Sequence, residues 1–131
     1  MSANQTPIHP KSIRHGVVAI APANANRDGT GTVGTLITAG TDGTLISVIM
    51  IKATVTTNAG LIRIFVHDGS AFFLVGEVAV DAITASATVA AFEPTWTPPG
   101  TEGLMLPSGY SIRVSTEKAE TFHVHCEGGD F

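Results

Sequence analysis

The 131-residue sequence contains few charged side chains. Asp, Glu, Lys and Arg together make up 14% of it, against about 25% in ordinary soluble domains, and the mean hydropathy is +0.29. Interspersed charges keep a solitary domain dispersed in water. We therefore expect much of the surface to be covered by copies of the same chain or by a larger assembly.

Basic residues are especially scarce. The chain has seven Lys and Arg residues and a formal net charge of -4, and the basic residues do not cluster. Nucleic-acid binding relies on clustered Lys and Arg side chains that neutralise phosphates. We expect no nucleic-acid partner.

Cysteine and long apolar runs are also nearly absent. The single Cys126 cannot form an internal disulfide and is interpreted as a small buried hydrophobe. No segment approaches the ~20 apolar residues of a membrane span, and no signal-peptide pattern opens the chain. We expect a soluble protein that is made and used inside a cell, without a membrane partner.

The sequence lacks the 3.6-residue period of amphipathic helices. From Gly16 onward, short β-prone runs alternate with turn residues. This pattern predicts an all-β fold with little or no helix, a single jelly-roll-like antiparallel β-sandwich of eight or nine strands over residues 16–131. The expected strands are Val17 to Ala21, Gly31 to Thr38, Leu45 to Thr54, Leu61 to His67, Ala71 to Val80, Thr88 to Phe92, Gly103 to Leu106, Ser111 to Ser115 and Thr121 to Cys126.

Residues 1–15, MSANQTPIHPKSIRH, have no apolar period. They predict an extended N-terminal arm, which is either a disordered terminus or a strap that orders along a neighbouring subunit. Lys11 and Ile13 are the arm residues that we assign to such a subunit interface.

The stretch LISVIMIKA is apolar on both faces of a regular strand. Alternation places Leu45, Ile49 and Ile51 on one face and Ile46, Val48 and Met50 on the other. Only one face can meet the core of its own sandwich, so an arm, a loop or another subunit must cover the second. We assign Ile46, Val48 and Met50 to the subunit interface.

Two later strands alternate in the manner of a half-solvated sheet. YSIRVST places Ser111, Arg113 and Ser115 on a polar side. TFHVHCE directs Phe122, Val124 and Cys126 inward.

A hairpin is predicted farther upstream. Asp68-Gly69 lies between the β-prone runs 61–67 and 71–80 and predicts a type I′ turn that joins them.

The proline-rich loop FEPTWTPPGTEG must run outside the central ladders because its prolines lack backbone donors. Its Trp96 is either a core anchor or an exposed contact residue. Phe72 is the second aromatic residue that we consider as an exposed contact.

Two motifs suggest metal sites. NANRDGTG resembles the first half of a calcium loop, but the twelfth position counted from Asn24 is Thr35 instead of Glu, so a turn is the favoured interpretation. The His123-x-His125 pair has the spacing of zinc, iron or copper ligands, as in the first cupin motif, but no second motif follows. Two exposed or interface histidines are the alternative.

Catalytic motifs are missing. There is no Gly-x-Ser-x-Gly elbow, no phosphate loop and no evident base beside Cys126. We expect no enzyme activity, no catalytic residue and no cofactor or metal.

Four stretches taken together resemble a group of small virion proteins of tailed bacteriophages, of the capsid decoration or cement type. They are NANRDGTGTVGTLITAGTDGT, IKATVTTNAGLIRIFVHDG, SATVAAFE and LPSGYSIRVSTEKAETFHVHCEGGDF, within residues 24–131. The resemblance implies a jelly-roll-like sandwich, often a homotrimer, made in the host cytoplasm. It implies a place on the outer capsid surface, where the partner is the major capsid protein.

Two other functions stay open. A tail-fibre or receptor-binding module of a phage would also be β-rich and trimeric, with Phe72, Phe73 and Trp96 as a glycan-binding patch. A cupin-like metal-binding protein would use the histidines near the C-terminus.

Overall fold

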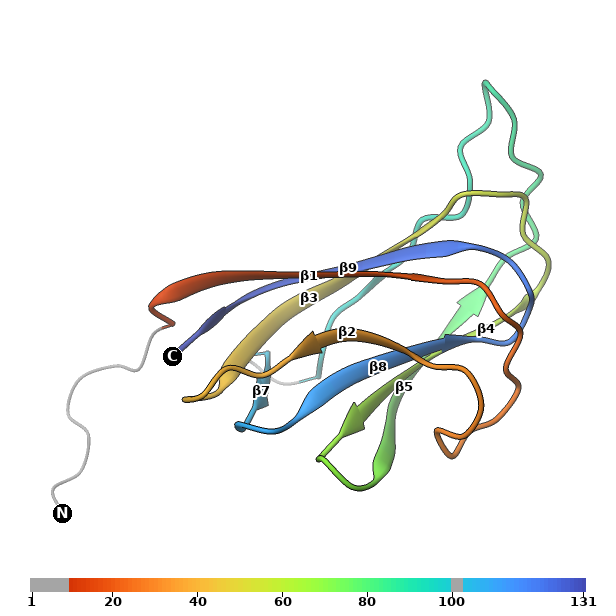
Figure 1. Ribbon diagram of the computed structural model, residues 1–131. Coiled ribbons are helices and arrows are strands. Elements are labelled where there is room, and N and C mark those ends of the chain that lie inside the picture. Colours follow the sequence, from red (N-terminus) through yellow and green to blue (C-terminus); the bar gives the residue numbers. More distant parts are fainter. Residues whose placement is uncertain (1–9, 100–102) are drawn as a thin grey trace, which may run out of the picture.

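In the computed structural model, the described residues, 10–99 and 103–131, form a β-sandwich of two antiparallel sheets (Figure 1). This part of the chain contains nine strands and no helix, which confirms the predicted fold class. The strands are β1 Ser12–Ile20, β2 Gly34–Thr38, β3 Thr44–Ala53, β4 Gly60–His67, β5 Phe72–Val80, β6 Thr95–Trp96, β7 Leu104–Leu106, β8 Ser111–Thr116 and β9 Phe122–Asp130.

The strand order is that of a jelly roll. Sheet A has the order β1-β9-β3-β6, with β7 also paired to β3, and sheet B has the order β2-β8-β4-β5. The first strands pair with the last in reverse order: β1 with β9, β2 with β8, β3 with β6 and β7, and β4 with β5. This is the pattern of a long antiparallel hairpin wound into two sheets.

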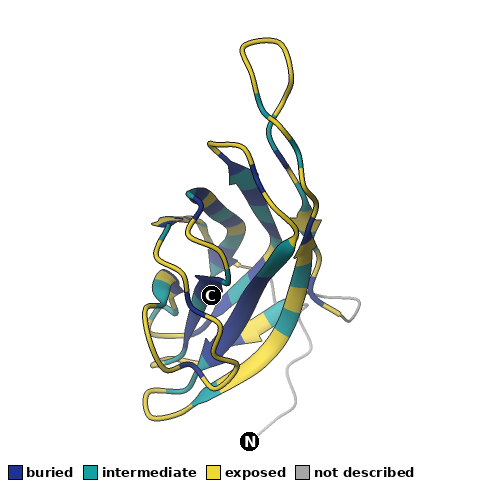
Figure 2. Ribbon diagram, turned by 90° about the vertical axis from the view of Figure 1, so that its right-hand side faces the viewer, coloured by how far each residue is buried: buried dark blue, intermediate teal, exposed yellow. Residues whose placement is uncertain are grey.

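One hydrophobic core fills the space between the sheets. Its largest side chains come from β3, β4, β8 and β9, whereas most residues of the connecting loops are exposed (Figure 2). The inward residues of β9 are Phe122, Val124 and Cys126, all at most 1% exposed, as the alternation predicted. Burial of a large aliphatic or aromatic side chain contributes about 1.5–3 kcal/mol, so this cluster is the main stabilising element of the fold.

The boundary predicted for the N-terminal arm is wrong over residues 12–15. β1 begins at Ser12 and pairs with β9 along its whole length, from Ser12 opposite Asp130 to Ile20 opposite Phe122. The pairing partner lies more than 100 residues away in the sequence, so the local pattern carried no sign of it. Residues 1–9 of the predicted arm lie outside the described part of the chain.

The polar side predicted for β8 is buried instead of solvated. Ser111 and Ser115 are each 2% exposed, and Arg63 on the neighbouring strand is 4% exposed. Segment 21–33 covers this outer face of sheet B: Gly29 lies against Phe72, and the backbone N–H of Asn24 donates to the carbonyl of Thr116. Arg27 and Arg63 also both donate from Nε to Oε2 of Glu77, at 3.1 Å each.

The predicted strand Thr88 to Phe92 is absent, and the two-residue β6 takes its place in the proline-rich loop. The loop still runs along β3, because the N–H groups of Ile51 and Ala53 donate to the carbonyls of Pro94 and Phe92 at 3.0 and 2.8 Å. Proline at an edge costs no ladder hydrogen bond, which explains why the segment borders the sheet without becoming a long strand.

The predicted hairpin is confirmed, but its turn is not of type I′. The N–H of Asp68 donates to the carbonyl of Ala71, so Gly69 and Ser70 are the central residues. Of these two, only Gly69 has a positive φ, of 100°, as in a type II′ turn. The Asp68 carboxylate accepts from the N–H groups of Ser70 and Ala71, and the backbone bond from Ala71 is the first cause of its lowered pKa.

Candidate functional site

The outer face of sheet A brings together side chains from four strands. Cross-strand partners point to the same side of a sheet, and the register aligns β1 and β3 on either side of β9. Ile13 and Leu45 both lie opposite Gly129, and Val17 and Met50 both lie opposite His125. The face consists of Ile13, His15, Val17 and Ala19 from β1, Leu45, Val48, Met50 and Lys52 from β3, Met105 from β7, and His123, His125 and Glu127 from β9.

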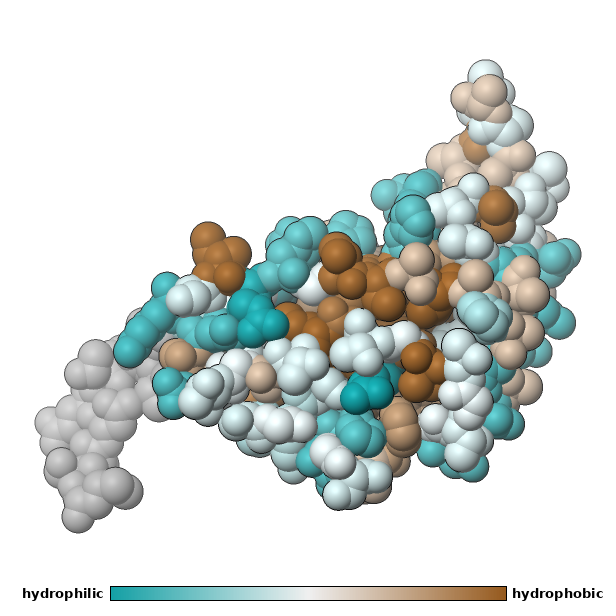
Figure 3. All heavy atoms as spheres, viewed as in Figure 1, coloured by the Kyte–Doolittle hydropathy of each residue, from teal (hydrophilic) through white to brown (hydrophobic). Residues whose placement is uncertain are grey.

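This face carries exposed apolar side chains on β1 and β7, with the polar side chains of β9 lying between β1 and β3. Ile13 is 94% exposed, Val17 66% and Met105 56%, while the aliphatic side chains of β3 are half-buried. Figure 3 views the sandwich from the edge formed by β1 and β2 and shows apolar side chains gathered along β1 at that edge. Its charged members are Glu127 and Lys52, and the Lys52 ammonium lies 3.5 Å from the Glu93 carboxylate. The exposed apolar side chains make this face a candidate interaction surface.

The assignment of Ile46 to this face is wrong. A register shift in the β3–β9 pairing between Ile46 and Val48 leaves Ser47 as an extra residue. Such a bulge reverses the alternation, so Ile46 is fully buried in the core and Leu45 turns outward. Val48 and Met50 lie on the outer face, as predicted.

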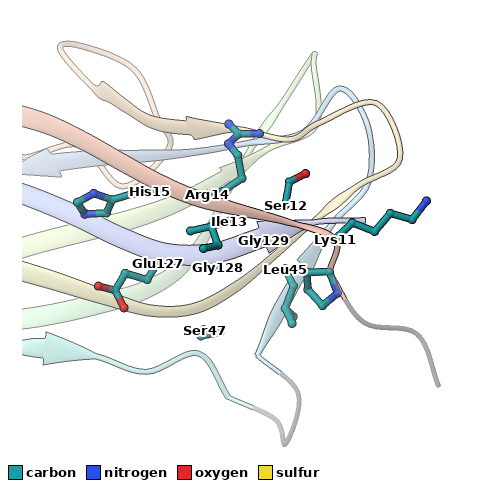
Figure 4. Close-up of a pocket in the computed structure, with 11 residues that line it drawn as sticks. Lys11, Ser12, Ile13, Arg14, His15, Leu45, Ser47, Glu127, Gly128 and Gly129 are labelled. Atoms are coloured by element: carbon teal, nitrogen blue, oxygen red, sulfur yellow. The ribbon is translucent and has the colours of Figure 1, made fainter.

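A shallow groove of about 730 Å³ runs along the start of β1 on the same face (Figure 4). Glycines occupy β9 at positions 128 and 129, so there is no side chain between Ile13 and Leu45, and Pro10 lies against Gly129. Lys11 lines one end of the groove. The structure therefore brings Lys11, Ile13, Val48 and Met50, four of the five predicted interface residues, to one side of the molecule.

Two histidines meet in the middle of the face. Nε2 of His15 lies 3.4 Å from Nδ1 of His125, and the ring centroids are 5.5 Å apart at an interplanar angle of 69°. His123 lies on the same side of β9, opposite Ala19 and Lys52. Among residues 10–99 and 103–131, no group of three or more His, Cys, Asp or Glu side chains is placed so that it could hold a metal ion.

The two aromatic residues predicted as exposed contacts are half-buried. Trp96 packs against the core, with its indole over Gly76 of the opposite sheet, where an added Cβ would lie 2.7 Å from ring atoms. This packing favours the anchor interpretation of Trp96. Phe72 contacts Phe65 and His67, with ring centroids 6.0 and 4.5 Å apart, because the outer face of sheet B is covered.

A second exposed apolar group lies on the edge strand β5. Phe73 is 53% exposed, Leu74 37% and Val75 38%. The β4–β5 register shifts where Ile64 faces Gly76 and Phe65 faces Leu74, which leaves Val75 as a bulge. Bulges on edge strands hinder further strand pairing, so this edge is less suited to β-sheet extension than its hydrophobicity suggests.

The loop that resembles a calcium site is a self-bonded turn. The side-chain amide of Asn24 donates to the carbonyls of Thr30 and Thr32 at 2.9 and 2.8 Å. Asp28 accepts from the hydroxyl and N–H of Thr30, and the hydroxyl bond is the first cause of its lowered pKa. In these bonds, donors and acceptors of the loop pair with each other, which supports the turn interpretation.

Cys126 lies in the core, and burial raises the pKa of its thiol. A thiol in such surroundings is largely protonated at neutral pH, while the thiolate is the nucleophilic form. The environment therefore matches the interpretation of Cys126 as a small buried hydrophobe.

Comparison with known proteins finds neither a family model nor a curated protein that matches this chain. The described residues include no helix that is long and apolar enough to cross a membrane. The site must therefore be interpreted from its own geometry.

Sequence reasoning missed His15, Val17, Leu45 and Met105 as members of the outer face. For the start of β1 the sequence gives no signal, because residues 12–15 show no alternation of apolar and polar side chains and their pairing partner lies near the other end of the chain. For Leu45, no sequence signal indicated the bulge at Ser47.

Proposed function

We propose that this protein is a structural subunit that acts by adhesion, a phage capsid decoration or cement protein that binds the outer capsid surface. The observation that carries the proposal is the outer face of sheet A, where Ile13, Val17 and Met105 are more than half exposed beside half-buried aliphatic residues of β3. The resemblance of residues 24–131 to small virion proteins supports the same role.

Adhesion of this kind requires contact area and no reaction. Complete burial of one large apolar side chain contributes about 1.5–3 kcal/mol, whereas association costs about 4–15 kcal/mol in lost freedom and ordering. Several side chains on one face are thus needed for a stable contact. A homotrimer that also contacts the major capsid protein would multiply weak contacts through multivalency, and no enzymatic activity is part of this role.

A second candidate function is a receptor-binding module of a phage tail. The observation that favours it is the exposed group Phe73, Leu74 and Val75 on β5, since aromatic side chains are common in glycan and protein contacts. Binding of the purified protein to host cells or surface polysaccharide would support this role, whereas a cement protein should bind capsids only.

The two surfaces are compared by placing one carboxylate on each. Val17→Glu puts a charge on the outer face of sheet A, and Val75→Glu is the matched change on the edge of sheet B. Because burying an unpaired charge is costly, we expect Val17→Glu to weaken self-association and binding to capsids that lack the protein by at least about tenfold. Val75→Glu should leave both unchanged. Sedimentation velocity and co-sedimentation measure the two quantities, and thermal unfolding verifies that both variants fold.

Two results would contradict the proposal. One is a wild-type protein that stays monomeric at high concentration and binds no capsids. The other is that Val75→Glu loses capsid binding while Val17→Glu keeps it. This result would place the capsid-binding surface on β5 instead of the outer face of sheet A.

A further inference from the structure

We infer that the free edge of β1 binds the β1 strand of a second copy of this chain in antiparallel orientation, so that sheet A continues from one subunit into the next. The inference rests on the self-association in the proposed function and specifies the strand that carries it. Addition of a strand at an exposed sheet edge is a recurring mode of recognition, because backbone hydrogen bonds hold the added strand.

β1 is the outermost strand of sheet A. It pairs with β9 on one side, and within the described part of the chain no strand pairs with its other side. The pairing with β9 covers all nine residues of β1 without a register shift, and the segment SIRHGVVAI contains neither proline nor lysine. Natural edge strands are usually protected from further pairing by short length, proline, lysine or a bulge. β1 has none of these protections.

The other edges of the two sheets are protected. β2 has five residues and a register shift between Thr35 and Ile37. β5 carries the bulge at Val75, and β6 and β7 have two and three residues. Among the strands of the described residues, β1 therefore has the edge that is best suited to pairing with a further strand.

The hydrogen bonds of sheet A show which backbone groups of β1 face the free edge. In an antiparallel ladder, successive residues direct their N–H and C=O groups to opposite sides of the strand. The N–H of Ile51 donates to the carbonyl of Pro94, on the side of β3 away from β9, so the neighbouring Met50 bonds toward β9, to its partner His125. Since the backbone groups of His125 are used toward β3, its cross-strand neighbour Val17 directs its own groups away from β9.

The same alternation holds for every second residue of β1, because its register with β9 is regular. The residues whose N–H and C=O groups face the free edge are Ile13, His15, Val17 and Ala19. Within residues 10–99 and 103–131 these backbone groups have no hydrogen-bond partner. A row of unpaired backbone donors and acceptors is a template for another strand.

β1 is complementary to itself in the antiparallel register that gives full overlap. Gly16 is the middle residue of the strand, so it would lie on a two-fold axis, opposite Gly16 of the second copy. In this register Ile13 lies opposite Ala19 of the second copy, and His15 lies opposite Val17 of the second copy. All four residues have backbone groups that face the edge, so each pair exchanges two hydrogen bonds. A shift by two residues would lose one of these pairs.

The charges of β1 do not oppose the contact. Arg14 bonds to Asp130 and to the carbonyl of Thr38 of its own chain. In the full-overlap register Arg14 lies opposite Val18 of the second copy, so no like charges are directly opposed. Like charges opposite each other would have been destabilising.

The pairing would extend the outer face of sheet A over two subunits. The side chains of the four edge-facing residues lie on that face, and the 94% exposed Ile13 would gain Ala19 of the second copy as a neighbour. The proposed capsid-binding surface would thus be continuous across two copies, which strengthens binding through multivalency. A two-fold contact joins two copies, so the unit is a dimer instead of the homotrimer that the resemblance implies.

Sedimentation velocity of the full chain tests the inference with two variants at Val17. Val17→Pro removes an N–H that faces the edge and keeps the bonds to β9, and proline is tolerated at such edge positions. Val17→Ala is the matched control, because it shortens the same side chain and keeps the N–H. We expect the wild-type protein to form dimers and Val17→Pro to dimerise at least about tenfold more weakly than Val17→Ala, since two symmetric hydrogen bonds are lost. Thermal unfolding verifies that both variants fold.

Hydrogen exchange of the wild-type amides, followed by NMR, keeps the test independent of variant folding. At concentrations where the dimer forms, the four edge-facing amides should exchange at least about tenfold more slowly than in dilute solution. The amides of Gly16 and Val18 bond to β9 and should be protected at both concentrations. A contact through side chains of the outer face alone would leave the edge-facing amides hydrogen-bonded to water.

Three results would overturn the inference. They are a wild-type protein that is monomeric or trimeric in solution, a Val17→Pro variant that associates as strongly as Val17→Ala, and edge-facing amides that exchange equally fast at both concentrations. Co-sedimentation with capsids separates these results from the proposed function. A protein that binds capsids but fails one of these tests keeps its proposed role and loses only the β1 contact.

Discussion

Arg14 and Asp130 join the first strand to the last: Nη1 of Arg14 lies 2.9 Å from both carboxylate oxygens of Asp130, across 116 residues of sequence. Nη2 of Arg14 donates to the carbonyl of Thr38, and the Thr44 hydroxyl donates to Asp130 at 2.6 Å. The pair therefore connects β1 and β9 to the end of β2 and the start of β3. Arg14 lies inside residues 1–15, which the sequence predicted to be an extended arm.

Truncation tests whether the sandwich begins at Ser12. The chain that lacks residues 1–9 gives the reference free energy of unfolding. Deletion of residues 1–15 removes four β1 residues with their ladder hydrogen bonds and Arg14, and should lower it by about 2–4 kcal/mol at about 0.5–1.5 kcal/mol per hydrogen bond. Urea unfolding followed by circular dichroism measures both. Equal stability of the two truncated chains would mean that residues 12–15 contribute nothing to the fold.

The same pair predicts a dependence of stability on pH. The hydrogen bond from Thr44, and then that from Arg14, hold the pKa of Asp130 below its ordinary value. A carboxylate with a lowered folded pKa stabilises the fold above its unfolded pKa of about 3.9, and this contribution is lost as the pH falls through the folded value.

Asp130→Asn isolates this contribution, because the other acidic groups are common to both proteins. We expect the wild-type protein to be more stable at neutral pH and the difference to shrink between about pH 5 and pH 2. Urea unfolding at several pH values measures the difference. A constant difference over the whole range would show that the charge of Asp130 plays no part.

The bulge at Ser47 predicts opposite outcomes for two adjacent residues of β3. Ile46→Ala should cost about 2–5 kcal/mol because it opens a cavity in the core. Leu45→Ala should cost about 1 kcal/mol or less, since Leu45 is half-buried on the outer face. Chemical denaturation measures both values. A larger loss of stability for Leu45→Ala than for Ile46→Ala would mean that β3 alternates regularly and has no bulge at Ser47.

The contact between Trp96 and Gly76 predicts a coupled pair of substitutions. An exchange of glycine for alanine in a strand normally stabilises by about 0.4–1 kcal/mol. At Gly76 the new Cβ would lie 2.7 Å from the indole, so Gly76→Ala should destabilise the protein by about 1–3 kcal/mol.

Trp96→Ala removes the indole, so adding Gly76→Ala to that variant should cost little. A double-mutant cycle from urea unfolding measures the coupling. Additive effects would indicate that the indole does not lie over Gly76.

Several elements could be predicted because their signals are local. The alternation of Phe122, Val124 and Cys126 gave the inward side of β9 correctly, and the turn residues around Gly69 located the β4–β5 hairpin. The short apolar runs and the absence of a helical period were enough for the fold class. The prediction that the polar side of β8 faces solvent was wrong, because its outcome depends on a distant part of the chain. Segment 21–33, far away in the sequence, covers that side.

The sequence by itself determined that this chain is an all-β sandwich with a weakly charged, apolar exterior, because strand period, turn chemistry and composition act over a few residues. Only the tertiary structure decided which side of β3 meets the core, that Ser12 begins a strand, and that His15 contacts His125. These features depend on pairing between segments up to 116 residues apart. Such pairing follows from the packing of the whole sandwich, which no short stretch of sequence contains.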